Sequence, residues 1–210
     1  KEVTPFMQEK SNDRFYGLFG ITGGATIKNL GLVNYNIDVS YTGVTEDIII
    51  WAGAFSGEFN CPDHNKSYDA PGDMENCYAD DGKISFNVNP AKNSEASISI
   101  QVGGLVGTAS LGKIHRCYHG SDITVKCNSP FYLAGAGIAA TITHLWITEC
   151  YNTGSISFPV GDAQMLSKAS FVGGIVGEVT PNGNINTMGK PKEKASYIAN
   201  CYNAGHLTAN

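Results

Sequence analysis

The chain has 210 residues and a formal net charge of −5 at pH 7, with 42% hydrophobic and 16% charged residues. Its 25 glycines and low charge are typical of an all-β protein rich in turns, argue against a helical fold, and leave enough apolar residues to build a core. The lack of a basic patch argues against a nucleic-acid partner, and no apolar run reaches the ~18 residues of a transmembrane helix.

Five related segments divide the chain, each opened by a block of small residues. The anchor glycines of these blocks are Gly17, Gly53, Gly104, Gly137 and Gly174. A Leu or Cys follows the anchor by 13 residues in three segments and by 24 and 27 in the second and fifth, which predicts insertions within about 58–73 and 180–195. The predicted coils are approximately 15–50, 51–101, 102–133, 134–171 and 172–210. Residues 1–14 are expected to form an N-terminal cap or linker.

Apolar positions recur at fixed offsets from this Leu or Cys. Three residues before it stand Ile27, Met74, Ile114, Ile147 and Ile198. Six or seven residues after it stand Ile37, Ile84, Ile123, Ile156 and Leu207, and the residue two further on is again apolar. This alternation predicts a strand with one buried face, preceded by a turn rich in Asn, Asp and Gly. With the glycine block interpreted as another short strand, each segment holds about three strands.

Short strands at a regular period build a sandwich, a propeller or a solenoid. A propeller blade needs four strands and usually a longer period, whereas the inward positions here match from segment to segment. We therefore predict an all-β fold, a right-handed parallel β-solenoid (β-helix) of about five coils with loop insertions. Equivalent residues would then stack ~4.8 Å apart along its axis.

Gly-Gly-Leu-Val-Gly at 103–107, followed by Ile-x-x-Cys-Tyr at 114–118, resembles the GLUG-motif repeat of bacterial surface proteins. Similar motifs lie at 150–156, 173–177 and 200–205 and, with Leu in place of Cys, at 17–32. The second and fourth blocks depart from the pattern. The resemblance covers roughly residues 15–210 and implies a β-solenoid with an extracellular location, at the cell surface or secreted. That family includes adhesin-like proteins and non-catalytic regions of immunoglobulin A proteases, and it supplies no catalytic residues.

Six cysteines in an extracellular chain would ordinarily suggest disulfides. Four of them share one repeat position: Cys77, Cys117, Cys150 and Cys201. Leu30 fills that position in the first segment, so we interpret it as buried and apolar and predict a structural ladder of Leu30 and inward-facing thiols. Parallel Cβ directions oppose bridging within such a ladder. Cys61 and Cys127 lie outside it, and a disulfide between these two remains an open alternative.

The sequence His115-x-Cys117-x-His119 contains residue types that zinc accepts. The repeat places Cys117 inward, His115 outward and His119 in a turn, so we expect the three not to converge. The second insertion and the residues after it, from Asp63 to Asp81, supply carboxylates of the kind calcium prefers, and calcium binding there stays open. We predict no metal site and no cofactor.

A tyrosine follows each of the four cysteines: Tyr78, Tyr118, Tyr151 and Tyr202. Stacked aromatic rings beside a turn would shield the corner of the coil. The alternative is a ligand strip that contacts sugar rings or a protein partner. The sequence leaves both interpretations open.

No Gly-x-Ser-x-Gly, His-Glu-x-x-His or P-loop motif occurs, and outward strand positions lack the paired carboxylates of glycoside hydrolysis. We predict no catalytic residues and a non-catalytic extracellular repeat module of a larger bacterial surface or secreted protein. This module, expected to be a monomer, would act in adhesion or as a spacer, with a host or cell-surface protein or glycan as partner. The alternatives are a carbohydrate-binding or carbohydrate-cleaving β-solenoid and an exodomain of an immunoglobulin A protease-like peptidase.

Overall fold

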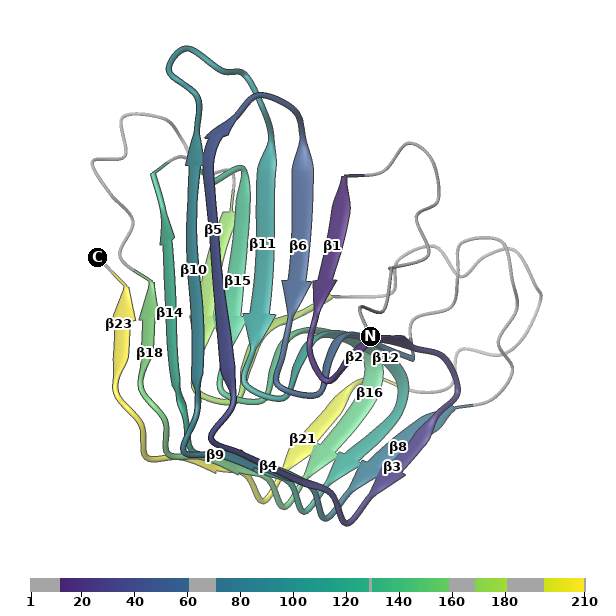
Figure 1. Ribbon diagram of the computed structural model, residues 1–210. Coiled ribbons are helices and arrows are strands. Elements are labelled where there is room, and N and C mark those ends of the chain that lie inside the picture. Colours follow the sequence, from purple (N-terminus) through teal and green to yellow (C-terminus); the bar gives the residue numbers. More distant parts are fainter. Residues whose placement is uncertain (1–11, 61–70, 129, 159–168, 181–194, 210) are drawn as a thin grey trace, which may run out of the picture.

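A computed structural model describes residues 12–60, 71–128, 130–158, 169–180 and 195–209 (Figure 1). Within these ranges every helix-or-strand element is a β-strand. The prediction of an all-β protein is therefore confirmed. Most of the second and fifth insertions lies outside the described residues, as do residues 1–11 of the predicted N-terminal cap.

The strands form four sheets, which we call A to D. Sheet A contains β1 (Asp13–Tyr16), β6 (Ile48–Ala52), β11 (Ile98–Gly103), β15 (Tyr132–Ala136) and β19 (Ala169–Gly173). Sheet B contains β2 (Phe19–Thr22), β7 (Ser56–Phe59), β12 (Val106–His115), β16 (Ala139–Thr148) and β20 (Val176–Val179), with β3 (Thr26–Lys28), β8 (Gly72–Glu75) and β21 (Tyr197–Ala199) along its second half. Sheet C contains β4 (Gly31–Val33), β9 (Tyr78–Asp80), β13 (Tyr118–His119), β17 (Tyr151–Asn152) and β22 (Tyr202–Asn203). Sheet D contains β5 (Asn36–Val44), β10 (Lys83–Pro90), β14 (Asp122–Cys127), β18 (Ile156–Phe158) and β23 (Leu207–Ala209).

Neighbouring strands in each sheet are parallel and come from distant parts of the sequence. In sheet D, for example, Lys83 of β10 pairs with Asn36 of β5 on one side and with Asp122 of β14 on the other. Parallel neighbours cannot be joined by a tight turn, so the chain passes through the other sheets before it returns. We call one such passage through sheets A, B, C and D a coil. The arrangement is compatible with a β-solenoid (Figure 1).

The two apolar rows expected from the repeat are both confirmed by the strand register. The first row runs through sheet B as Ile27, Met74, Ile114, Ile147 and Ile198. The second runs through sheet D as Ile37, Ile84, Ile123, Ile156 and Leu207. The inner members are fully buried, whereas Ile198 and Leu207 on the last coil are 42% and 47% exposed.

The glycine blocks form corners, which corrects the prediction that they are strands. Gly104 and Leu105 lie between β11 and β12, where the chain turns from sheet A into sheet B. A Cβ on Gly104 would lie 2.1 Å from the Gly137 carbonyl oxygen and 2.4 Å from the ring of His119, so this corner has no room for a side chain. The strand that precedes each corner belongs to sheet A. A coil therefore contributes strands to four sheets, whereas three strands per segment were expected.

Two hydrophobic clusters fill the interior. The A–D core lies between sheets A and D and includes Ile50, Ile84, Phe86, Ile100, Ile123 and Phe158. The B–C core includes Phe55, Phe59, Met74, Leu105, Ile114 and Ile147. In Figure 1, sheets A and D face each other in one arm of the molecule, and sheets B and C extend from its base. Side chains of the second cluster define the surroundings of the candidate site.

Candidate functional site

Each coil turns from sheet B into sheet C at a single residue with a positive φ. These corner residues are Asn29 (φ 55°), Asn76 (φ 53°), Arg116 (φ 53°), Glu149 (φ 55°) and Asn200 (φ 54°). Asparagine accepts this left-handed conformation better than other residues with a Cβ. The corner sets the two side chains that follow it on opposite sides of the chain: the Leu or Cys turns inward and the next residue faces outward.

The inward residues gather in the B–C core. Cys77 is 1% exposed, and Cys117 and Cys150 are fully buried. Cys201 on the last coil is half-buried, and Leu30 on the first coil packs against the same cluster. The structure thus brings together all five residues of the predicted ladder.

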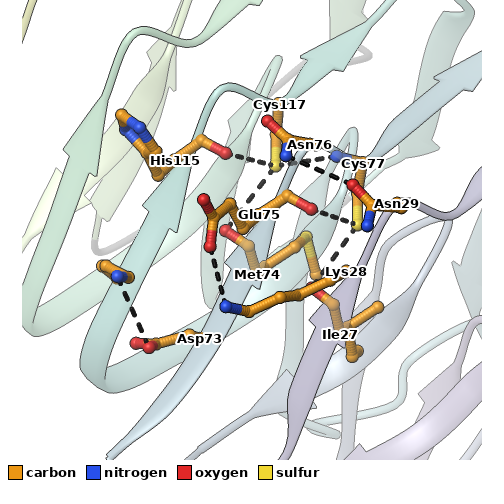
Figure 2. Close-up of polar contacts among 11 residues, drawn as sticks. Ile27, Lys28, Asn29, Asp73, Met74, Glu75, Asn76, Cys77, His115 and Cys117 are labelled. Carbon is orange, nitrogen blue, oxygen red and sulfur yellow. Dashed lines mark hydrogen bonds and ion pairs between the residues drawn. The ribbon is translucent and has the colours of Figure 1, made fainter.

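Backbone amides and sulfur atoms connect neighbouring coils along this ladder (Figure 2). The Cys77 amide donates to the Sγ of Cys117 over 3.4 Å, and the Cys117 amide donates to the Sγ of Cys150 over the same distance. The Cys150 amide makes the equivalent bond to Cys201. Each sulfur therefore accepts a hydrogen bond from the coil before it, and the row is more than a set of apolar side chains.

The thiol hydrogens are directed at carbonyl oxygens. The Sγ of Cys117 lies 3.2 Å from the His115 carbonyl oxygen in its own coil and 3.7 Å from the Met74 carbonyl oxygen in the coil before it. Contact with the thiols of Cys150 and Cys77, together with burial, raises the pKa of the Cys117 thiol. Since the thiolate is the form that attacks electrophiles and binds metals, this buried thiol has a structural role.

The four tyrosines form a second ladder on the outside of sheet C, which we call the tyrosine ladder. Its ring centroids are 5.1 Å apart from Tyr78 to Tyr118, 4.9 Å from Tyr118 to Tyr151 and 5.1 Å from Tyr151 to Tyr202. The planes of neighbouring rings differ by only 3° to 4°. The rings therefore cover each other's faces, and the ladder presents ring edges and hydroxyl groups to solvent.

The two ends of the tyrosine ladder differ in how far the terminal ring is covered. A Cβ on Gly31 would lie 2.2 Å from Cζ of Tyr78, so the Tyr78 ring occupies the space that a side chain would need. At the other end, Tyr202 is 57% exposed. In the middle, the Tyr118 hydroxyl donates to Oδ2 of Asp80 over 3.3 Å. The predicted ligand strip is present as a row, but ring stacking leaves it few open faces.

His119 differs from the expectation that it lies in a turn. It belongs to β13 and is fully buried, because its side chain points inward beneath the corner at Gly104. Its Nδ1 lies 2.9 Å from Oδ1 of Asn152 and its Nε2 lies 3.1 Å from the Tyr35 hydroxyl. Burial lowers the pKa of His119 to about 4, so the ring is neutral at pH 7.

Asn152 continues this polar row through the interior. Its Nδ2 donates to the Gly154 carbonyl oxygen over 2.8 Å and to Oδ1 of Asn203 over 2.7 Å, which assigns its own Oδ1 as the acceptor for the His119 Nδ1–H. The burial of His119 and Asn152 was not expected, whereas Asn203 at the end of the row is exposed. The sequence signal was an Asn followed two residues later by Gly in successive segments.

The residues considered for metal binding are directed to different places. His115 lies on the outer face of sheet B, where its Nδ1 is 2.9 Å from Oγ1 of Thr148, whereas Cys117 points into the B–C core and His119 lies in the polar row. Among the described residues, no group of three or more His, Cys, Asp or Glu side chains is arranged to hold a metal ion.

The acidic residues near the second insertion are divided between sheets. Glu75 pairs with Lys28 over 2.9 Å and Asp73 with Lys113 over 3.6 Å, both on sheet B (Figure 2). Asp80 lies on β9 in sheet C. The insertion residues Asp63 and Asp69 lie outside the described residues. Cys61, whose disulfide with Cys127 was left open, also lies outside the described residues. Cys127 itself is buried at the end of β14.

An exposed aromatic pair on sheet B was missed by the sequence reasoning. Trp146 is 46% exposed and Tyr197 is 54% exposed, and their rings meet edge to face with centroids 6.2 Å apart. Trp146 alternates with the buried Leu145 and Ile147, which marks it as outward-facing. This alternation could have predicted an exposed Trp146 from the sequence. Aligning the segments did not reveal it, because that alignment detects only residue types that recur.

Comparisons of the chain with protein-family models, with curated proteins and with solved structures returned no match. The described residues contain no helical segment with the length and hydropathy of a membrane span.

Proposed function

We propose that the chain is a right-handed parallel β-solenoid of about five coils. It serves as a non-catalytic extracellular module of a larger bacterial surface or secreted protein, in adhesion or as a spacer. The observation that carries this proposal is the continuity of the side-chain rows: the cysteine and tyrosine ladders both run from coil to coil. Stacked repeat units of this kind provide a long surface rather than one pocket, and the resemblance to the GLUG-motif repeat favours a bacterial cell surface.

The carboxylates that the structure describes around the ladders support a non-catalytic role. Glu75 and Glu149 form ion pairs with Lys28 and Arg116 over 2.9 Å each, and these pairs lower the pKa of both carboxyl groups. A general acid for glycoside hydrolysis needs a raised pKa and a second carboxylate on the other side of the scissile bond. The two ion pairs do the opposite, because they favour the ionised form of Glu75 and Glu149.

A bead-adhesion assay tests the proposal. Beads coated with the folded chain are expected to be retained by epithelial cells or by a bacterial lawn, and beads coated with the unfolded Cys150→Asp variant are expected to wash away. Retention of folded beads alone supports adhesion. Equal loss of both bead types would rule out adhesion and leave the spacer role.

A second measurement tests the non-catalytic assignment. The chain is incubated with plant, bacterial and animal glycans, and new reducing ends are measured against a heat-unfolded sample of the same protein. We expect no difference between the two samples. Release of reducing ends by the folded protein alone would overturn the assignment and favour the carbohydrate-cleaving alternative.

A further inference from the structure

The aromatic side chains on the surface differ in how much ring face they offer to a partner. In the tyrosine ladder each inner ring is covered on both sides by its neighbours. On sheet A, Trp51 is half-buried and stacked on Phe15, with centroids 4.8 Å apart and planes 7° apart. These stacked rings hold the coils together and present their edges outward. Apart from the terminal ring of Tyr202, these rows therefore offer little ring face to a ligand.

Trp146 and Tyr197 have a different geometry. Their planes lie at 65° to each other, so they meet edge to face and do not cover each other completely. Both rings belong to paired positions on β16 and β21, on the outer face of sheet B. The equivalent residues in the earlier coils are polar: Thr26, Asp73 and Lys113. The last two coils thus replace a polar row by an aromatic pair at the surface.

A hollow of about 360 Å³ lies at this pair, lined by Trp146, Tyr197, Ala195 and Ser196. Binding sites for small molecules usually begin near 300 Å³, but this hollow is wide open to solvent, so it can cover one face of a sugar unit without enclosing it. Tryptophan and tyrosine are also the residues most enriched where proteins make energetically important contacts.

The lack of charge in the residues that line the hollow favours a neutral ligand. None of the four lining residues carries a charge. The nearest equivalent position along the row is Lys113, whose ammonium group is 3.6 Å from Asp73 and so partly neutralised. The surface of the hollow is almost entirely apolar and is dominated by the two aromatic rings. Such a surface suits a neutral ligand that lays an apolar face on the rings and keeps its polar groups in water.

We propose that this hollow binds a neutral sugar unit of a cell-surface glycan. One face of a sugar ring consists of C–H groups, whose positive hydrogens are attracted to the negative face of the indole. The sugar hydroxyls, at the rim of the ring, stay in contact with water. The inference rests on the proposed adhesive function and names the ligand class and the site for it.

Tryptophan fluorescence provides a direct test, because the chain has two tryptophans. In Trp51→Phe the remaining indole is Trp146, and the new ring still stacks on Phe15. In Trp146→Phe the remaining indole is Trp51. Both variants are titrated with gluco-, manno-, galacto- and chito-oligosaccharides. We expect a saturable change in emission for Trp51→Phe and none for Trp146→Phe, with unchanged urea midpoints as evidence of folding.

Binding to the same oligosaccharides immobilised on a chip completes the test. Trp146→Ala and Tyr197→Ala are expected to weaken binding by about tenfold or more, the usual effect of removing a central aromatic contact. Tyr202→Ala is the matched control, since it removes an equally exposed aromatic ring from the tyrosine ladder. Loss of binding in Tyr202→Ala with normal binding in Trp146→Ala would overturn the assignment of the site.

The bead assay separates failure of this inference from failure of the proposed function. Retention on cells that is insensitive to glycosidase treatment and to Trp146→Ala would mean that the partner is a protein, and the sugar site would be rejected while adhesion stands. No retention on cells and no binding to any oligosaccharide would reject both adhesion and the sugar site.

Discussion

The backbone amide of Cys117 donates a hydrogen bond to the Sγ of Cys150, one coil further along the chain, over 3.4 Å. Both residues are fully buried, so water cannot replace the acceptor if the sulfur is removed. A cysteine at this position therefore fills space and also satisfies the amide of its neighbour. Leu30 can occupy the first coil because β4 is the edge strand of sheet C among the described residues. The amide of Leu30 donates to the sulfur of Cys77. Among the described residues no earlier coil presents an amide to the Leu30 side chain, so an apolar side chain is tolerated there.

Replacing Cys150 by Val tests this dual role. The two side chains are similar in size, but the Cys117 amide would be left buried without an acceptor, at a cost of about 1–3 kcal/mol in the free energy of unfolding. Urea denaturation measures the loss. Leu30→Val is the matched control, because it removes one methylene and orphans no amide, and should cost about 1 kcal/mol. A Cys150→Val variant as stable as wild type would show that sulfur acts only as an apolar filler.

A charge at the same position should be far more damaging. Cys150→Asp would place a carboxylate among the apolar side chains of the B–C core. An uncompensated buried charge costs about 3–5 kcal/mol, which is a large part of the stability of an ordinary domain. We expect loss of the cooperative thermal transition and of native β-sheet circular dichroism. A wild-type melting curve would mean that residue 150 does not point inward.

The buried His119 makes stability depend on pH. Its pKa is about 4 in the folded protein because burial disfavours the charged form, compared with about 6.5 in an unfolded chain. Between these values only the unfolded state takes up the proton. The free energy of unfolding is therefore unaffected by His119 above about pH 6.5. It falls as the pH drops towards 4, by about 3 kcal/mol in all.

His119→Asn should remove this pH dependence without a loss of stability at pH 7. Asparagine already occupies the same position in the next two coils, as Asn152 and Asn203. Each of these donates from Nδ2 to the carbonyl oxygen two residues on, over 2.8 Å. Urea midpoints of both proteins between pH 4 and pH 7 provide the measurement. Parallel pH profiles for the variant and the wild type would contradict the assignment to His119.

The corners at Arg116 and Glu149 offer a way to stabilise the protein. Both residues have the positive φ that asparagine tolerates better. Their mutual ion pair of 2.9 Å is exposed to solvent and so adds little to stability. Replacing both by Asn extends the contact already present between Asn76 Nδ2 and Asn29 Oδ1, which is 3.2 Å long.

We expect this double variant to be about 1 kcal/mol more stable than wild type, with a higher thermal midpoint. Either single variant, which loses the ion pair and relieves one corner, should lie between the two. A double variant that melts below wild type would show that the ion pair outweighs the backbone strain.

Repetition determined which parts of this structure were predictable. The rows that contain Ile114 and Ile123 were predicted correctly, because the same residue type recurs at one offset and a strand register that aligns them buries every copy. The strands of sheet A were harder to recognise. Ile48, Ile49, Ile50 and Trp51 show no alternation of polar and apolar residues, since their outward side chains are themselves half-buried.

The polar interior was missed for a different physical reason. Asn and His next to glycine usually signal a turn, and isolated residues of this type would be costly to bury. In the structure His119 and Asn152 satisfy each other and the backbone, so the cost is offset by neighbours that a single segment does not reveal. Trp146 escaped notice because nothing like it occurs in the other coils.

The amide-to-sulfur bonds also give the stack of coils a direction. Every donor lies in the earlier coil and every acceptor in the later one. Shortening the stack from its late end would expose the Cys150 amide without its sulfur partner, whereas shortening it from the early end would leave only a weak acceptor unused. The stack of coils is thus chemically asymmetric along its length, and we expect loss of coils to be tolerated better at one end than at the other.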